Sequence, residues 1–198
     1  MRRRTFDAIT TSIGIGLTLV LLVAGGLALW GYNFANDNVR DQLSAQQIYF
    51  PAKGSDALKP ADIGPYLNKY AGQKLTRGDQ AQAYADHFIA VHLREVADGK
   101  TYAQVSSAAQ ADPNNAQLQQ QANTLFKGEA LRSMLLEAYA FWKIGQIALW
   151  AAIAGFVGAA VMAVLSALGA IHLRRTDPAA ELDTKTAPPA AATEPVIA

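Results

Sequence analysis

The sequence predicts an all-α fold in which two transmembrane helices flank a small helical extracytoplasmic domain. Two apolar runs indicate the transmembrane helices: residues 8–36 contain no charged residue, and His172 is the only ionisable side chain in residues 144–173. About 20 apolar residues cross the hydrocarbon core of a bilayer, so each run is long enough with some tilt. Neither run has the polar face that a soluble helix of this length requires. Between the runs, no segment shows the sustained polar–apolar alternation of a strand.

Basic residues at the outer flanks of the two runs predict the orientation. Arg2–Arg4 precede the first run and Arg174 and Arg175 follow the second, so both termini are expected in the cytoplasm. The opposite ends of both runs carry the aromatic residues that favour a membrane–water interface. These are Trp30, Tyr32, Phe34, Tyr139, Phe141 and Trp142. A cleaved signal peptide is the alternative for the first run, with residues 24–26 as a small-residue site, but this run is longer than a usual signal core.

The predicted organisation has five parts. A basic cytoplasmic N-terminus (1–7) precedes the first transmembrane helix (8–32), and an extracytoplasmic helical domain (33–142) leads to the second transmembrane helix (143–173). A cytoplasmic tail (174–198), rich in Ala, Pro and Thr, is expected to be disordered.

Start and stop signals divide the extracytoplasmic segment into helices. Gly99 stands where glycine favours the end of a helix, and Thr101 is a good cap for the next one. Asp112 and Pro113 together form a start signal, and Gly128 separates the two helices that follow. The expected helices are residues 33–47, 66–70, 78–98, 102–109, 113–126 and 129–142, the last continuing into the second span.

The composition limits the kinds of site that the chain can contain. The absence of cysteine excludes disulfides, thiolate metal ligands and a cysteine nucleophile. The net charge is +1, and residues 31–143 carry eleven basic and eleven acidic side chains, which gives no reason to expect nucleic acid as a partner. Phosphate-binding loops, nucleophile elbows and His-Glu-x-x-His motifs do not occur. We therefore expect no cofactor, no metal ion and no enzymatic activity.

Two of the three histidines lie in the segment Tyr84–Glu95. On a uniform helical wheel, His92 falls near the middle of an apolar arc with Glu95 beside it, whereas His87 falls on the polar face. Two histidines that chelate a metal from one helix normally lie four residues apart, and these lie five apart. We predict that His92 is a core residue satisfied by Glu95 or a backbone group, and that His87 is exposed. A ligand pocket or a hydrolase site at His92 and Glu95 is the alternative.

The second span presents small residues at helical spacing. In lipid, small residues let helix backbones approach closely and gain dispersion contacts. This face has two interpretations, which the sequence leaves open: packing of the two spans on each other, and docking onto another membrane protein. Its residues are Ala151, Gly155, Ala159, Ala163 and Ala167, one at every fourth position, widened by Gly158.

Three stretches carry a family resemblance: Tyr84–Glu95, Asp98–Ser106 and Leu125–Arg132. With them, the chain resembles a family of uncharacterised two-span membrane proteins of actinobacteria that has no established activity. The resemblance implies the two-span architecture and a bacterial plasma (inner) membrane, and it implies nothing about catalytic residues.

These observations favour a non-catalytic integral membrane protein that serves as an accessory or scaffold subunit. Its expected partners are the lipid bilayer and either another membrane protein or a second copy of the chain. The alternative function is an extracytoplasmic module that senses or binds a ligand between its helices.

Overall fold

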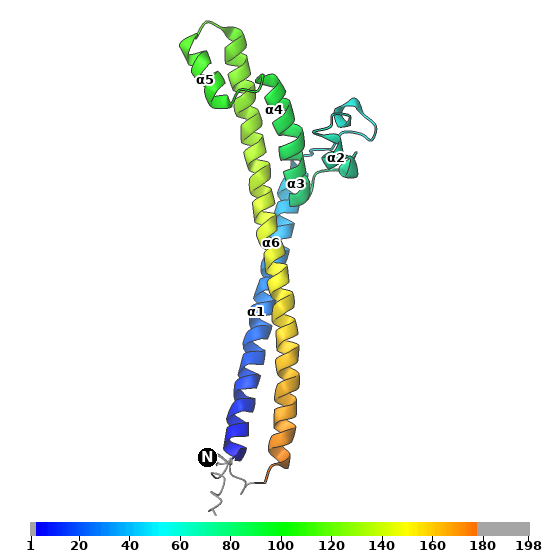
Figure 1. The fold of residues 1–198 in the computed structure, drawn as a ribbon, viewed down its shortest axis with the longest axis vertical. Coiled ribbons are helices and arrows are strands. Elements are labelled where there is room, and N and C mark those ends of the chain that lie inside the picture. Colours follow the sequence, from blue (N-terminus) through cyan, green and yellow to red (C-terminus); the bar gives the residue numbers. More distant parts are fainter. Residues whose placement is uncertain (1–2, 178–198) are drawn as a thin grey trace, which may run out of the picture. The chain divides into compact units, whose positions relative to one another are not determined.

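The computed structural model describes residues 3–177, and every regular element in this range is helical (Figure 1). The predicted all-α fold is therefore confirmed for these residues. An isolated antiparallel bridge joins Tyr49 to Lys74. The helices are α1 (Arg3–Ala45), α2 (Gly64–Leu67), α3 (Gly78–Tyr84), α4 (Ala90–Val96), α5 (Tyr102–Ala111) and α6 (Ala116–Arg175), with 3-10 turns at η1 (Asp56–Leu58) and η2 (Asn68–Tyr70) and a π-helical segment, η3 (Ala85–Ile89).

The two long helices, α1 and α6, are each long and apolar enough to cross a membrane. The most apolar window of each has a mean hydropathy of 2.3, and 11% of that window is buried inside the molecule. The backbone divides into two compact units, and both helices contribute to each. We call Gly26–Ile153 the helical unit, and the described parts of Met1–Gly25 and Ala154–Ala198 the paired unit.

Within the paired unit, α1 and α6 run antiparallel and approach each other closely at glycines. A Cβ atom on Gly155 would lie 3.1 Å from Cα of Gly25 and 3.3 Å from the carbonyl oxygen of Leu21. A Cβ on Gly169 would lie 2.7 Å from Oγ1 of Thr11. Since these distances leave almost no room for a side chain, glycine permits the close packing of the two backbones.

A seven-residue repeat marks the faces that α1 and α6 bury. Heptad spacing keeps one face of a helix against its neighbour over many turns. In α1 the buried and half-buried positions recur at Thr11, Thr18, Gly25, Tyr32 and Val39, and again at Gly14, Leu21, Ala28 and Ala35. In α6 they recur at Ala138, Gly145, Ala152, Ala159 and Ser166.

The core of the helical unit lies between α1, α6 and the segments that connect them. It contains Leu43 from α1, Leu75 from the connecting segment, Ala85 and Leu93 from the middle helices, and Leu135 from α6, all less than 9% exposed. The segment between α1 and α3 is held by backbone bonds in which Phe50 N–H donates to Gln73 O and Leu75 N–H donates to Ile48 O, both at 2.9 Å. Buried side chains and these backbone bonds therefore hold the connecting segment in place.

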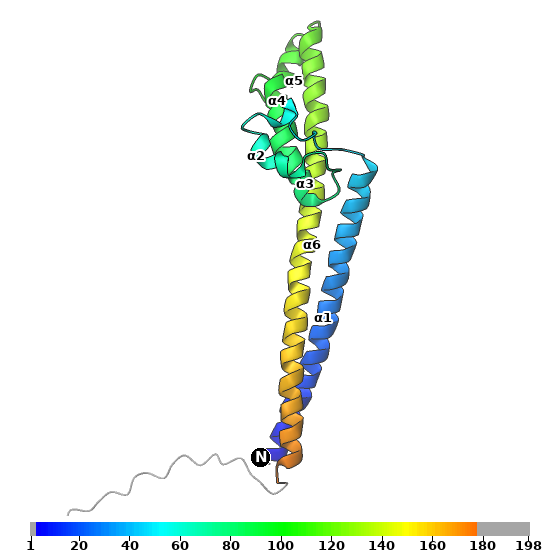
Figure 2. The same ribbon diagram turned by 90° about the vertical axis from the view of Figure 1, so that its right-hand side faces the viewer.

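Helix α5 packs against the first turns of α6 (Figures 1 and 2). The rings of Tyr102 and Phe126 lie 5.8 Å apart, and Nε2 of Gln119 donates a 2.6 Å hydrogen bond to the carbonyl oxygen of Ala109. Thr101 caps α5, as predicted, through a capping box with Gln104.

The N-terminal part of α6 differs from the prediction of two helices at 113–126 and 129–142. Asp112 ends α5: its N–H still donates to the carbonyl oxygen of Ala108, but its backbone angles, φ −128° and ψ 78°, are not helical. Asn115 is the residue that caps α6: its Oδ1 accepts a 3.1 Å hydrogen bond from the N–H of Leu118. At its other end α6 includes Arg174 and Arg175, which were expected in the tail, and the predicted tail from residue 178 lies outside the described residues.

Gly128 lies inside α6 and does not interrupt it. The lack of a side chain at Gly128 instead permits close packing. A Cβ atom there would overlap the side chain of Leu93 on α4. Gly78, the first residue of α3, has the same relation to Trp142, whose Cβ and ring carbons fill the space beside it. These two glycines let the middle helices lie close to α6.

We predict that Gly78→Ala lowers the stability of the helical unit by about 1–3 kcal/mol, because the added methyl group meets the stem of Trp142 rather than a mobile side-chain end. Gly31→Ala in α1 is the matched control: no atom lies within 4 Å of its Cβ position, and alanine is the better helix former by about 1 kcal/mol. Thermal unfolding of the full-length protein in a mild detergent measures both. Equal unfolding temperatures for the two variants would contradict the packing role of Gly78.

Candidate functional site

His92 lies on the surface of α4, so the prediction of a core histidine is wrong. Its Nδ1 donates to the carbonyl oxygen of Phe88 at 2.7 Å, and its ring lies 4.4 Å from the Phe88 ring. The expected backbone partner is therefore present, but the burial is not. Glu95 is also exposed, and among residues 3–177 no hydrogen bond joins it to His92.

The π-helical segment η3 explains the misplaced histidine. A π turn contains an additional residue, so every later side chain moves around the helix axis relative to a uniform wheel. Through α3, η3 and α4, buried side chains recur at every fourth residue, at Ala81, Ala85, Ile89, Leu93 and Ala97, with Gln80 and Val91 also buried. Leu93 thus takes the central apolar position that the uniform wheel gave to its neighbour His92.

His87 is half-buried rather than exposed, because it stacks on Tyr66. The two ring centroids lie 3.5 Å apart with an interplanar angle of 3°. Beside this pair, Asp86 accepts a 3.2 Å hydrogen bond from Nη2 of Arg132, which ties η3 to α6. Among the described residues, no group of three or more His, Cys, Asp or Glu side chains is arranged to hold a metal ion. His87 and His92 thus each contact one aromatic ring, that of Tyr66 and that of Phe88.

Tyr84 is the one described group whose titration is clearly displaced. Burial raises the pKa of its phenol above the ordinary value of 10.0. Its ring packs edge-on against Phe50 at 5.3 Å. The phenol of Tyr84 thus stays neutral where it packs against the core of the helical unit.

The small-residue face of α6 divides into two parts. Gly155 and Gly158 are half-buried and Ala159 is 1% exposed, and the two glycines lie against α1 at Gly25 and Leu21. Ala163 and Ala167 are exposed, as is Ala151 in the helical unit. A four-residue step overshoots a full helical turn, so a strict four-residue stripe winds around the helix and cannot face one neighbour throughout. Part of the face therefore packs on α1, and part is left free.

The free part of this face borders an apolar groove between α1 and α6 in the paired unit. The groove has a volume of about 270 Å³. Ala163, Ala167 and Ala170 form one wall, and Ile15 and Leu19 of α1 form the other. Small side chains on one wall and branched ones on the other make a hollow in which a bulky apolar side chain would fit. We call it the intramembrane groove, after the membrane placement that is proposed below.

Ser166 is a polar residue that lines the intramembrane groove. It is 8% exposed, and its Oγ is a buried atom without a hydrogen-bond partner among the described residues. In an apolar environment such a hydroxyl costs free energy until it finds a partner. This hydroxyl lies against Gly14 of α1 and is not open to the groove, so the surface that the groove presents is largely apolar.

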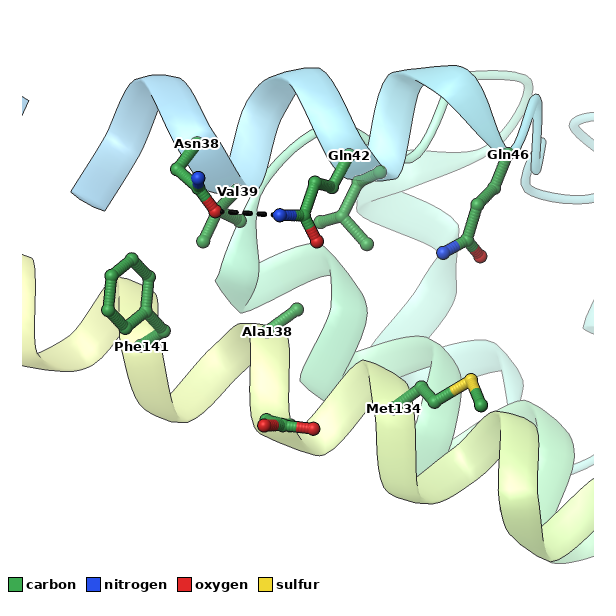
Figure 3. A pocket seen from close by; sticks show the side chains of 9 residues that line it. Asn38, Val39, Gln42, Gln46, Met134, Ala138 and Phe141 are labelled. Carbon is green, nitrogen blue, oxygen red and sulfur yellow. Dashed lines mark hydrogen bonds between the residues drawn. The ribbon is translucent and has the colours of Figure 1, made fainter. Parts of the chain in front are cut away.

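A more polar groove lies in the helical unit, between the C-terminal part of α1 and α6. Its volume is about 380 Å³. Figure 3 shows Asn38 and Gln42 on α1 and Gln46 in the turn that follows it, in a row that faces Met134 and Phe141 on α6. Nε2 of Gln42 donates to Oδ1 of Asn38 at 2.9 Å. We call this site the amide groove. Glu137 also lines it, so carboxamide groups and one carboxylate stand over an apolar floor.

The sequence contained a signal for the amide groove that was missed. Asn38, Gln42 and Gln46 recur at four-residue spacing beyond the first apolar run, which places them on one side of a continuing helix. The α6 residues that form the opposite wall could not be predicted from the sequence, because they depend on how α6 aligns with α1.

No protein-family model, curated protein or solved structure matches this chain. The resemblance to the two-span actinobacterial family therefore stays a prediction, and the function is argued from the geometry.

Proposed function

We propose that this protein is a non-catalytic, two-span protein of the bacterial plasma membrane that acts as an accessory or scaffold subunit. In this proposal α1 and α6 cross the bilayer, the helical unit lies outside the cytoplasm and both termini lie inside. The intramembrane groove binds a transmembrane helix of another membrane protein.

The exposure of the apolar helices supports the membrane placement. Large side chains such as Val20, Val23 and Trp150 are 63–70% exposed on the surfaces of α1 and α6. A soluble protein rarely leaves so large an apolar surface in water, whereas lipid covers it at no cost. Cleavage of α1 as a signal peptide would also remove Thr11 and Gly25, which cover the glycines of α6. An uncleaved anchor therefore fits the packing better.

The intramembrane groove is the observation that carries the subunit role. Helices associate in lipid through small residues that allow close backbone contact and through hydrogen bonds between polar side chains. Ala163 and Ala167 supply the first feature. Because α1 already covers Gly155 and Ala159, the groove is the part of the small-residue face that remains for a partner.

We predict that Ala163→Leu with Ala167→Leu removes a stoichiometric partner when the tagged full-length protein is purified in a mild detergent. The added side chains would fill the groove, and mass spectrometry identifies the co-purifying proteins. Ala154→Leu is the matched control: it makes the same change at an exposed position nine residues from Ala163, which places it on the opposite side of the helix.

Three outcomes are distinguishable. A partner that Ala154→Leu retains and the double variant loses supports the subunit role. If the partner is a second copy of the chain, self-association replaces the proposed role as a subunit of another membrane protein. Recovery of the protein alone, with both variants behaving alike, would contradict a partner at the groove.

The amide groove favours one second candidate function, the sensing of a small polar ligand. The amides of Asn38 and Gln42 can donate and accept hydrogen bonds, and the carboxylate of Glu137 suits an amine. Met134 and Phe141 would cover an apolar part of the same molecule. This combination of a few polar groups over an apolar floor is typical of ligand sites.

If the amide groove is a sensor site, a small amine or amide from a metabolite panel should raise the unfolding temperature of the full-length protein. A ligand at 100 times its dissociation constant contributes about 2.7 kcal/mol. Gln42→Leu should abolish this increase, whereas Gln110→Leu on α5, an exposed glutamine outside the groove, should preserve it. No shift across the whole panel would reject sensing.

A further inference from the structure

A third cleft, of about 270 Å³, lies in the helical unit where the two predicted spans end. Tyr32 of α1 and Trp142 of α6 line it together with Asn33. Phenol, indole and amide groups are hydrogen-bond donors that favour the headgroup layer of a membrane. Two arginines, Arg40 and Arg77, also border this cleft, which we call the interface cleft.

The level of the interface cleft in the bilayer rests on the proposed membrane placement. Tyr32 is the last residue of the first predicted span, and Trp142 immediately precedes the second. Arg40 lies about two helical turns beyond Tyr32. Side chains in a helix point back toward its N-terminus, which on α1 is the direction of the span. The Arg40 guanidinium is therefore directed toward the level at which lipid phosphates lie.

The charges that line the interface cleft leave one cation and one anion unpaired. Arg77 is already neutralised, because its Nε donates to Oδ1 of Asp79 at 3.0 Å and its Nη2 donates to Oδ2 at 2.7 Å. Asp37 and Arg40 also line the cleft, and neither forms an ion pair within the part of the chain that the structure describes. A ligand that matches the cleft carries both signs of charge.

We propose that the interface cleft binds a phosphoethanolamine group. The phosphate accepts hydrogen bonds from the guanidinium of Arg40 and the amide of Asn33, and the primary ammonium donates to the carboxylate of Asp37. Guanidinium groups match phosphate geometry well, and a primary ammonium provides three donors. The group has two sources, the headgroup of phosphatidylethanolamine and soluble phosphoethanolamine.

Native mass spectrometry of the full-length protein in detergent tests this site, with dimyristoyl phosphatidylethanolamine and phosphatidylglycerol as probes. The wild type should bind phosphatidylethanolamine more tightly. Arg40→Gln should weaken the binding of both lipids about tenfold, as expected for the loss of a charge-assisted hydrogen bond. Asp37→Asn should remove the preference for phosphatidylethanolamine. Arg94→Gln, an exposed arginine on α4 that pairs with Asp62, should change neither.

Equal affinity of the wild type for both lipids, or an unchanged affinity in Arg40→Gln, would overturn the proposal. Soluble phosphoethanolamine added as a competitor distinguishes the sources: displacement of the lipid assigns the soluble molecule, and no displacement assigns the lipid headgroup. Alkaline carbonate extraction of cell membranes that contain the protein tests the proposed membrane placement separately. Release of the wild type would reject the proposed function, whereas a retained protein with Arg40-independent lipid binding would reject only this site.

Discussion

The close approach of α1 and α6 is the constraint on which the rest of the structure depends. Both helices repeat buried residues at seven-residue intervals, and the residues at these positions in the paired unit are small or short. Close backbone approach at Gly25, Gly155 and Gly169 provides dispersion contacts, which would hold the two helices together in the proposed bilayer setting, where no hydrophobic driving force acts between them. In the helical unit α1 adds larger buried residues such as Val39 and Leu43, whereas the repeat on α6 stays small at Ala138, Gly145 and Ala152.

The same packing determines which surfaces are left for other molecules. Because α1 covers Gly155 and Ala159, the small residues nearer the C-terminal end of α6 border the intramembrane groove instead. Helices α3 and α4 pack closely on α6 where Gly78 and Gly128 leave room for Trp142 and Leu93. The amide groove lies along α1 and α6, and its amide row is set by four-residue spacing on α1. Interaction sites in this chain thus follow from the sizes of the residues in its helix contacts.

The long apolar runs, the cap at Thr101 and the all-helical class could be predicted from sequence, because each depends on local composition. The position of His92 could not be predicted, because one π turn at residues 85–89 displaces every later side chain around the helix axis. No local sequence pattern indicates this turn. Gly128 suggested a helix break from its sequence alone. Its packing role could not be predicted, because its tertiary neighbour, Leu93, is 35 positions away in the sequence. The small-residue face was recognised, but its division between α1 and the groove depends on the direction from which α1 approaches.

The membrane topology is tested most directly by labelling single cysteines, because the chain contains none of its own. Thr5 at the start of α1 and Ser107 on α5 are both exposed, so cysteine at either position reports accessibility with little effect on packing. A membrane-impermeant maleimide applied to spheroplasts should label Ser107→Cys at once and Thr5→Cys only after permeabilisation. Labelling of Thr5→Cys in sealed spheroplasts, or protection of Ser107→Cys, would contradict a two-span protein with its helical unit outside the cytoplasm.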